Sequence, residues 1–510
     1  MLRRTTLAVF LLVSHAAAQG GDWPQFRGPG GLAVADDTPI PTAFGPDEKV
    51  LWKTKVPVGQ SSPCIVGGLV FVTGFEDGLD VVLAIEREGG KVRWTKTFEG
   101  PPHPTYYHPD AAQAGATPVS DGERVIASFG NYGLVALDLE GKVLWEKRLP
   151  LPRYAFGVGS SPLLYDGLLV VSRDGAPEAG ILVFDATDGS ELWRIDRFEY
   201  GESHGTPFLW HNADRDELVL SGSGRLCAYD PGTGERLWIV EGLTSFPCTT
   251  PTADEDTLYF AAWSTPNATG RSFWEGAFAR SLDLSDAEIA DPSLLFKRLD
   301  HDENGKVVPD EVPECRAKDA FGFLDRDQSG AWELEEMLKA ESPSNSTGEN
   351  LMVAVARGAK GDAKEHVRWS WKRGLPYVSS PLLYRGRVWL FQAGGLVSVL
   401  EAKTGKSILD RERLSDRSEY YLSPVGAAGH VLAGSAGARS TCSPRTRTSW
   451  WSSTPSRSTR SCSRRQPCST GSSTCVRSRP CGPSASGARS EAKEAAARTL
   501  RSGPIPSPAC

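Results

Sequence analysis

Short apolar runs bounded by glycine-rich turns recur along most of the chain. In the stretch 163–195, an apolar run follows the turn Asp166-Gly167, a second run follows shortly after, and Glu191-Leu192-Trp193 follows the turn Thr187-Asp188-Gly189. Runs of this length, closed by turns of glycine and aspartate, are typical of antiparallel strands. No helical periodicity accompanies them, so each unit is predicted to contain four short strands.

A small residue followed by proline opens each of these units. The signature occurs at Ser62-Pro63, Thr117-Pro118, Ser161-Pro162, Thr206-Pro207, Thr250-Pro251, Ser380-Pro381 and Ser423-Pro424, with proline spacings of 55, 44, 45, 44, 130 and 43 residues. The spacing of 130 is about three repeat lengths. One repeat accounts for about 44 of these residues, so roughly 85 extra residues are inserted in the fifth repeat.

Four strands per 44 residues are typical of a β-propeller blade. Most units close on a tryptophan strand, with Trp94, Trp145, Trp193, Trp238 and Trp369 at equivalent places and Leu409 taking the place in the sixth. One blade cannot bury both of its faces, so a large indole wedged between neighbours is expected. We predict an all-β propeller over residues 22–437 with seven recognisable repeats, in which Val50-Leu51-Trp52-Lys53 supplies a closing strand to the last blade.

The sequence resembles a known family at the opening Asp22-Trp23-Pro24-Gln25-Phe26-Arg27-Gly28-Pro29 and at blade endings such as Ala136-Leu137-Asp138 followed by Gly141-Lys142-Val143-Leu144-Trp145. It is similar to secreted bacterial propellers built from pyrroloquinoline-quinone-type repeats. These include quinoprotein dehydrogenases and the propeller subunit of the outer-membrane β-barrel assembly machinery. The resemblance covers about 22–437, and since such propellers commonly have eight blades, it implies that an eighth blade once followed the seventh.

The insertion contains two twelve-residue segments, 300–311 and 325–336, that both fit the calcium loop of an EF-hand. That loop takes side-chain oxygens from positions 1, 3 and 5, a backbone carbonyl from position 7 and a bidentate glutamate from position 12, around a glycine at position 6. Gly305 and Gly330 occupy the sixth position. The predicted ligands are Asp300, Asp302, Asn304, Lys306 and Glu311 in the first loop and Asp325, Asp327, Ser329, Ala331 and Glu336 in the second.

Two full matches 25 residues apart favour a paired EF-hand unit over a solvated acidic segment. Residues 294–299 and 333–340 are the expected flanking helices, and Val307 and Trp332, both at position 8, are expected to pair as a short strand between the loops. We place the unit at 285–342. Outside the cell it would serve as a structural clip rather than a signalling sensor.

The two ends of the chain differ from its body. Arg3 and Arg4, the apolar run 7–13 and Ala16-Ala17-Ala18 have the pattern of a secretory signal peptide over residues 1–18, so we expect export to the periplasm or the extracellular space. Residues 431–510 carry a net charge of +11 against −18 for residues 1–430, and residues 438–510 are dominated by Ser, Arg, Thr, Pro and Cys. This composition cannot form a core and predicts a disordered tail.

A changed reading frame would account for that tail. Back-translation of residues 461–477 with GC-rich codons, read in a shifted frame, can give Leu-Leu-Ala-Thr-Pro-Ala-Leu-Leu-Asp-Gly-Leu-Val-Tyr-Val-Arg, which is a repeat motif. Its proline would fall near position 465, about one repeat after Pro424. We hypothesise that a frameshift near Gly437 replaced the end of blade seven and the whole of blade eight.

Other candidate chemistry is weaker. His103 and His108 lie in a proline-rich segment of the second repeat, where an ordinary surface loop is favoured over a site for a metal or a sugar. His204, just before a repeat proline, is expected to be a blade-edge residue. No catalytic residue is assigned. The acidic body argues against nucleic-acid binding, and no segment is long and apolar enough to span a membrane.

The family resemblance leaves two functions open. Quinoprotein dehydrogenases have an adjacent Cys-Cys disulfide at the cofactor, whereas this chain has no Cys-Cys pair, which argues against pyrroloquinoline quinone. The favoured hypothesis is a monomeric, calcium-binding scaffold for protein or envelope interactions. The alternative is a quinone-dependent dehydrogenase of alcohols or sugars.

Overall fold

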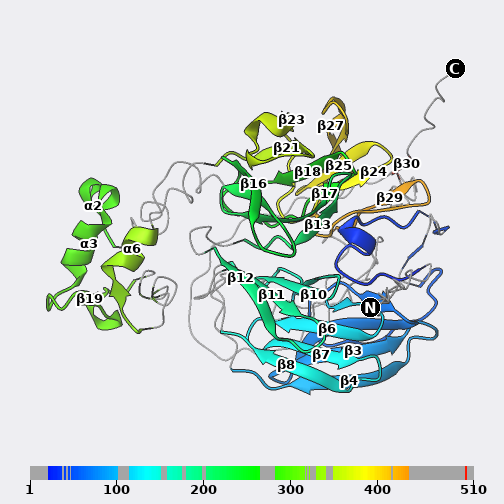
Figure 1. Ribbon diagram of the computed structural model, residues 1–510, viewed down its shortest axis with the longest axis horizontal. Helices are drawn as coiled ribbons and strands as arrows, with labels where there is room; N and C mark the ends of the chain where they lie inside the picture. The colour runs from blue at the N-terminus through cyan, green and yellow to red at the C-terminus, as the bar shows by residue number, and fades with distance from the viewer. Residues whose placement is uncertain are drawn as a thin grey trace, which may run out of the picture.

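The computed structural model describes residues 21–435, except 37–38, 42–43, 46, 102–113, 151–157, 175–179, 198–202, 265–281, 316–317, 319–320, 322–324, 326–328, 341–347 and 415–416, and the backbone of 500–501. Its architecture is mostly antiparallel β-sheet, with a small helical unit at one side (Figure 1). This is the β-propeller-like arrangement that the repeats predict. The signal-peptide prediction and nearly all of the predicted tail lie outside the described residues.

Seven sheets follow one another along the chain, and we call them blades 1 to 7. Blade 1 contains β1 (Cys64–Val66), β2 (Leu69–Glu76), β3 (Leu79–Glu86) and β4 (Val92–Phe98). Blade 2 contains β5 (Val119–Ser120), β6 (Arg124–Phe129), β7 (Gly133–Asp138) and β8 (Val143–Arg148). Blade 3 contains β9 (Leu163–Tyr165), β10 (Leu168–Ser172), β11 (Gly180–Asp185) and β12 (Glu191–Asp196).

Blade 4 contains β13 (Phe208–His211), β14 (Asp216–Gly222), β15 (Arg225–Tyr229), β16 (Arg236–Glu241) and, as a fifth strand, β22 (Gly361–Asp362). Blade 5 contains β17 (Thr252–Ala253), β18 (Thr257–Ala262), β21 (Leu351–Ala356) and β23 (Val367–Trp371). Blade 6 contains β24 (Leu382–Tyr384), β25 (Arg387–Gln392), β26 (Leu396–Glu401) and β27 (Ser407–Arg413). Blade 7 has three strands, β28 (Val425–Ala427), β29 (His430–Leu432) and β30 (Leu500–Arg501).

The residue before each repeat proline links its blade to the next. The backbone N–H of Ser62 donates to the hydroxyl of Thr117 at 3.0 Å, and the N–H of Thr117 donates in turn to the hydroxyl of Ser161 at 3.0 Å. The same bond recurs, at 3.0–3.1 Å, from Ser161 to Thr206, Thr206 to Thr250, Thr250 to Ser380 and Ser380 to Ser423. We call this series the hydroxyl belt. It explains why serine or threonine precedes the proline in the six repeats from Thr117 to Ser423, whose hydroxyls accept these bonds.

The outer strands dock through their tryptophans. The indole N–H of Trp94 donates to the carbonyl of Leu139 at 2.9 Å, that of Trp145 to Ala186 at 2.9 Å and that of Trp369 to Ala402 at 3.0 Å. Each acceptor is the first residue after the third strand of the following blade. A glycine in that turn lies under the ring, so the repeated turn glycine and the repeated tryptophan have one shared cause, the packing of one blade on the next.

Substituting this turn glycine is expected to be costly. A Cβ on Gly189 would lie 2.7 Å from the Trp145 ring, whereas a Cβ on Gly167, which has a similar positive φ of 77°, would meet no atom within 4 Å. Gly167→Ala should therefore cost only the backbone strain, about 1 kcal/mol, and Gly189→Ala should cost about 1–3 kcal/mol more because the indole must move. Urea unfolding of both variants measures the difference. Equal losses would show that the indole contact is unimportant.

Trp238 departs from this pattern. It is fully buried, and its indole donates to the Glu217 carboxylate of its own blade at 2.7 Å, while Glu217 also accepts from Arg215 at 3.0 Å. The turn after β21 crosses to blade 4, where β22 pairs in parallel with β16 and covers the ring. The prediction that this tryptophan packs between blades is confirmed, since Trp238 shares a buried cluster with Leu258 and Phe260 of blade 5. Only its hydrogen-bond partner differs, because β22 takes the place of the usual turn.

The N-terminal segment crosses the ring. Trp23 bridges to Ile65 of blade 1, Val34 bridges to Gly426 of blade 7, and the Arg27 side chain between them is buried against blades 5 and 6. Its guanidinium donates to the carbonyls of Thr250 (3.4 Å), Pro251 (3.2 Å) and Pro381 (2.7 Å). Figure 1 places the short helix η1 (Pro29–Gly31), just after Arg27, on the side away from the helical unit.

Candidate metal centre

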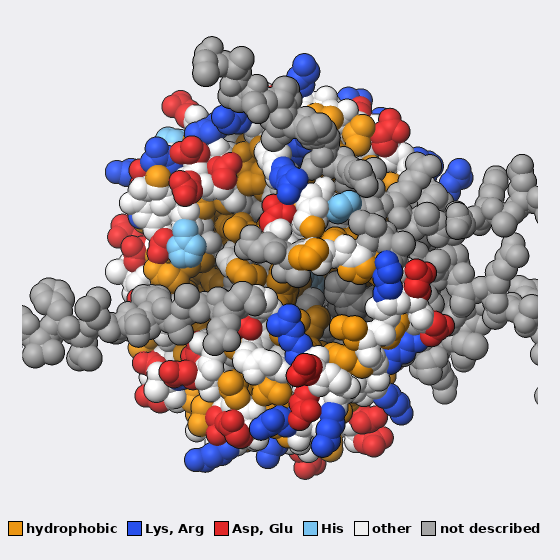
Figure 2. All heavy atoms as spheres, turned by 90° about the vertical axis from the view of Figure 1, so that its right-hand side faces the viewer, with side chains coloured by type: hydrophobic (Ala, Val, Ile, Leu, Met, Phe, Trp, Pro, Cys, Tyr) orange, Lys and Arg blue, Asp and Glu red, His pale blue; other side chains and the backbone are white. Residues whose placement is uncertain are grey.

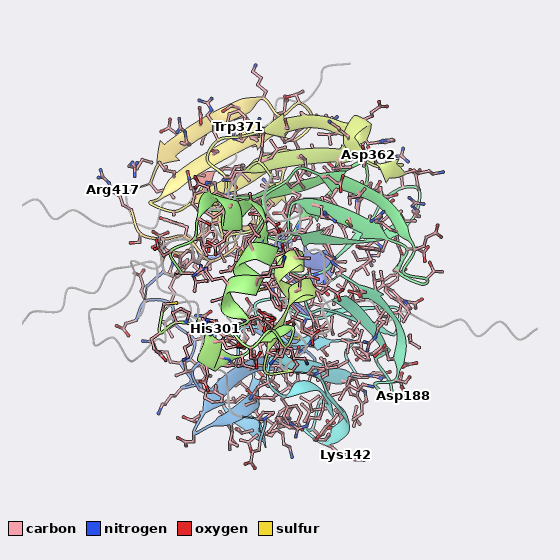
Figure 3. All side chains as sticks on the ribbon, turned by 90° about the vertical axis from the view of Figure 1, so that its left-hand side faces the viewer. Lys142, Asp188, His301, Asp362, Trp371 and Arg417 are labelled. Atoms are coloured by element: carbon pink, nitrogen blue, oxygen red, sulfur yellow. The ribbon has the colours of Figure 1, made fainter. Side chains whose placement is uncertain are left out.

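The helical unit is an insertion between the second and third strands of blade 5. It contains α2 (Asp286–Ala290), α3 (Pro292–Leu299), β19 (Lys306–Val307), η4 (Pro309–Glu311), β20 (Trp332–Glu333) and α6 (Leu334–Ala340). The predicted flanking helices are thus confirmed, and α2 is an additional one. Figure 3 shows the unit in front of the ring, with His301 of the first loop labelled.

The two ends of the insertion lie side by side. Ala262 still pairs with Leu351, and Asn350 exchanges two hydrogen bonds with the backbone of Ser264, at 2.8 and 2.9 Å. The sheet of blade 5 is therefore continuous despite the inserted residues. An insertion whose ends meet in this way can fold without altering the host sheet.

The unit has its own core. Leu295, Phe296, Leu299, Val307, Val312, Phe321, Trp332 and Met337 form one buried cluster. The rings of Phe321 and Trp332 stack with centroids 4.5 Å apart, and the indole N–H of Trp332 donates to the Phe321 carbonyl at 2.7 Å. Val307 pairs with Trp332 between β19 and β20, as the two matching eighth positions predict.

The first loop brings three of its predicted acidic ligands together. Carboxylate oxygens of Asp300, Asp302 and Glu311 all lie within 4.8 Å of one another. The backbone N–H groups of Asn304 and Gly305 donate to Asp300 at 3.0 and 2.9 Å, which turns the chain around that carboxylate. Three carboxylates held together around a tight turn suit a hard cation, because the ion offsets their mutual repulsion.

The second loop repeats this hydrogen-bond pattern. Gly330 N–H donates to Asp325 at 3.2 Å, as Gly305 does to Asp300, and Glu333 N–H donates to Glu336 at 3.1 Å, as Val308 does to Glu311 at 2.8 Å. The Ser329 hydroxyl lies 3.1 Å from the Ala331 carbonyl, so two further predicted ligands face one another. Asp327 lies outside the described residues.

Positions 5 and 7 of the first loop also fit the predicted donor set. The Asn304 side chain lies against Asp302, with its amide nitrogen 2.8 Å from a carboxylate oxygen, and its oxygen accepts from Lys306 N–H at 2.8 Å. The Lys306 ammonium itself points to Glu333, 3.2 Å away, rather than into the loop. Lys306 can therefore offer its carbonyl without placing a positive charge at the ion.

A buried ion pair lies in blade 3, where the sequence gives no signal. Asp174 and Arg197 are both 0% exposed and lie 3.0 Å apart, on the connections that follow β10 and β12. Burial raises the pKa of Asp174 to about 6, although Arg197 and His204 oppose the rise. His204 lies in the connection before β13, with its ring 5.2 Å from that of Phe246. His103 and His108 lie outside the described residues.

The pH dependence of stability should report this pair. The pKa of Asp174 is raised above its ordinary value of 3.8, so its contribution is most favourable below about pH 4 and is lost as pH rises through about 6. The free energy of unfolding of wild type should contain a decrease of about 2 kcal/mol between pH 4 and 7 that comes from Asp174, and Asp174→Asn should lack this decrease. Urea unfolding across this range, with wild type in parallel, measures it, and parallel curves would contradict the raised pKa.

The first half of the chain is similar to a known protein family. A family model described as outer membrane protein assembly factor BamB matches residues 20–156, 82–262 and 177–289, which together make up more than half of the chain. The outer membrane protein assembly factor BamB of Burkholderia pseudomallei (strain K96243) is 29% identical over 213 residues, 40% of this chain and 50% of that protein. The protein of the same description from Kangiella koreensis is 32% identical over 126 residues, 23% of this chain and 30% of that protein.

The chain thus spans about half the length of the first of these relatives and less of the second. Among solved structures, BamB from Moraxella catarrhalis aligns over 77% of this chain and 88% of its own, with 15% identity and a TM-score of 0.47. Quinohemoprotein alcohol dehydrogenase from Comamonas testosteroni aligns over 82% and 77%, with 14% identity and a TM-score of 0.40. No helix in the described part of the chain is long and apolar enough to cross a membrane.

Proposed function

Because the chain belongs to the PQQ-like repeat family whose model is described as outer membrane protein assembly factor BamB, we propose that it is an exported, non-enzymatic scaffold for protein assembly in the cell envelope, with a calcium-binding EF-hand pair. The match of the family model across the first blades supports the proposed scaffold role. The shared hydrogen-bond pattern of the two loops carries the calcium part.

The scaffold is proposed to use the face from which the insertion emerges. In a four-stranded antiparallel blade, the connections between second and third strands and those between successive blades meet at one face. Connections of more than ten residues, such as 99–118, 149–162, 197–207, 263–350 and 414–424, are of this kind. Turns between first and second strands at the opposite face, such as 67–68, 166–167 and 385–386, have two residues, and the ten-residue connection 357–366, which carries β22, is the longer one there. Loops held on a rigid scaffold are where binding residues are concentrated in proteins.

The opposite side offers a useful contrast. Figure 2 shows this side, with acidic and basic side chains around the rim and hydrophobic side chains toward the middle. Lys142 lies in a short turn there, at the edge of the ring in Figure 3, while Arg417 lies in the connection before blade 7. The two residues therefore give a matched pair of charged positions, one on each face.

Complementation tests the scaffold proposal. The exported chain should restore assembled outer-membrane proteins in a bacterium that lacks its own BamB. Arg417→Glu should weaken the rescue, and Lys142→Glu should leave it unchanged. Failure of the wild-type chain to restore assembly, despite normal export, would contradict the proposal. Dye-linked dehydrogenase activity after addition of pyrroloquinoline quinone and calcium would instead favour the enzyme.

The insertion can be separated from the ring. Because Ser264 and Asn350 are joined by two hydrogen bonds, residues 265–349 can be replaced by a short glycine linker without stretching blade 5. This variant should bind no calcium at the loops and keep the fold of the ring. If it also loses the rescue, the insertion takes part in assembly. If it keeps the rescue, calcium serves the insertion alone.

A further inference from the structure

The segment 50–56 has the form of an outer blade strand. Trp52, Thr54 and Val56 are half-buried while Leu51, Lys53 and Lys55 are exposed, which is the alternation of the outer strands β4, β8 and β12. Its even positions face blade 1, where Trp52 and Val56 pack on Val70, Val81, Leu83 and Ile85. A strand of this alternation is buried on one side only, as expected of an outer strand.

Trp52 docks on blade 1 as the other outer tryptophans dock on their neighbours. Its indole N–H donates to the carbonyl of Arg87 at 2.9 Å, and Arg87 is the first residue after β3. The turn glycine is also present, since a Cβ on Gly90 would lie 2.4 Å from the Trp52 ring, as one on Gly405 would lie 2.6 Å from Trp369. Segment 50–56 is therefore the outer strand of the blade that precedes blade 1.

That blade has no inner strands among the described residues. Segment 50–56 belongs to none of the seven sheets. Leu51, just before the tryptophan, is 95% exposed, whereas Leu144 and Leu192, at the equivalent place in blades 2 and 3, are 44% and 48% exposed. Leu51 is thus about twice as exposed as the equivalent leucines of blades 2 and 3, which have inner strands beside them.

The hydroxyl belt is open at the same place. In the part of the chain that the structure describes, the belt begins at Ser62 and ends at Ser423, so neither a donor to the Ser62 hydroxyl nor an acceptor for the Ser423 N–H is supplied by a neighbouring blade. One further serine or threonine before a proline, placed between blades 7 and 1, would close it. The shifted-frame reading of residues 461–477 contains Ala-Thr-Pro, with the threonine in that position.

We propose that segment 50–56 is the outer strand of an eighth blade whose three inner strands are encoded by the same gene in the reading frame shifted after about codon 437. The hairpin Ala-Leu-Leu-Asp-Gly-Leu-Val-Tyr-Val-Arg supplies its first two strands, with Asp-Gly as the two-residue turn. In the part of the chain that the structure describes, Trp52 docks on blade 1 and no strand pairs with the other edge of segment 50–56. This proposal is independent of the scaffold and of calcium binding.

The gene sequence is the first test. One alternative frame downstream of about codon 437 should encode the end of blade 7 and then a small-residue-Pro signature near position 465, followed by strands rich in Val and Leu. A frame that encodes these features without a stop codon supports the proposal. Its absence from both alternative frames overturns it.

The second test compares two full-length proteins, the chain as given and the chain after a single-nucleotide insertion that restores the frame. Backbone amides of residues 50–56 should exchange at least about 100-fold more slowly in the restored protein, while those of β4 should exchange alike in both. Equal exchange of 50–56 in the two proteins overturns the proposal.

A matched pair of variants makes the same comparison at the belt. Ser161 accepts a belt hydrogen bond from Thr117, whereas none of the described residues before blade 1 donates one to the Ser62 hydroxyl. Ser161→Ala should therefore lower the Tm in both proteins by about 2 °C, and Ser62→Ala should do so only in the restored one. A loss from Ser62→Ala that is the same in both proteins would count against closure of the belt by an eighth blade.

Discussion

Replacing Arg27 with methionine is expected to lower the free energy of unfolding by about 3 kcal/mol or more. The buried guanidinium joins three carbonyls from blades 5 and 6, and methionine fills a similar volume without a donor. Burial lowers the pKa of Arg27 to about 9, so the group stays charged at pH 7. Urea denaturation, with the m-value checked for constancy, measures the loss.

Two further variants sharpen that experiment. Arg413 also donates to a carbonyl, that of Gly394 at 3.0 Å, but it is exposed, so Arg413→Met should change stability by less than about 0.5 kcal/mol. Arg27→Lys keeps the charge but cannot present a planar fork to carbonyls on two blades, and an intermediate loss is expected. If Arg27→Met were as harmless as Arg413→Met, the N-terminal crossing would not hold the ring together.

The second large effect concerns the last position of each loop. Glu336→Gln and Glu311→Gln should each weaken calcium binding at their own loop by about 100-fold or more, because the bidentate carboxylate becomes a neutral amide. Calorimetric titration of the full chain should show two sites in wild type and one strong site in each variant. Chelation of calcium should also lower the melting temperature of the insertion.

The neighbouring acidic residues provide the control. Asp310→Asn and Glu335→Gln remove the same charge at position 11, which supplies no ligand, and should alter affinity by only a few-fold. A uniform loss in all four variants would indicate a general effect of negative charge. Two unchanged sites in the position-12 variants would contradict the assignment of the ligands.

Much of the architecture follows from local pattern. The seven proline signatures, the four strands of each of the first six repeats, the insertion in the fifth repeat and the strand pair that joins the two loops are all present in the structure. These features depend on residues within one repeat or one loop, where spacing along the chain is also spacing in space. Glycine at position 6 of each loop is of this kind, because the turn itself requires a positive φ.

Other features depend on contacts between distant repeats. The sequence could not reveal that Arg27 reaches Pro381, that Asp174 is buried against Arg197, or that β22 crosses to blade 4 and gives Trp238 a different partner. Such contacts have no period, since each is made once and between segments that only ring closure brings together. The sequence alone therefore determined the repeat and the candidate metal ligands. Only the tertiary structure decided which side chains join the blades, and it showed that the segment carrying Trp52 docks on blade 1 as an outer blade strand does.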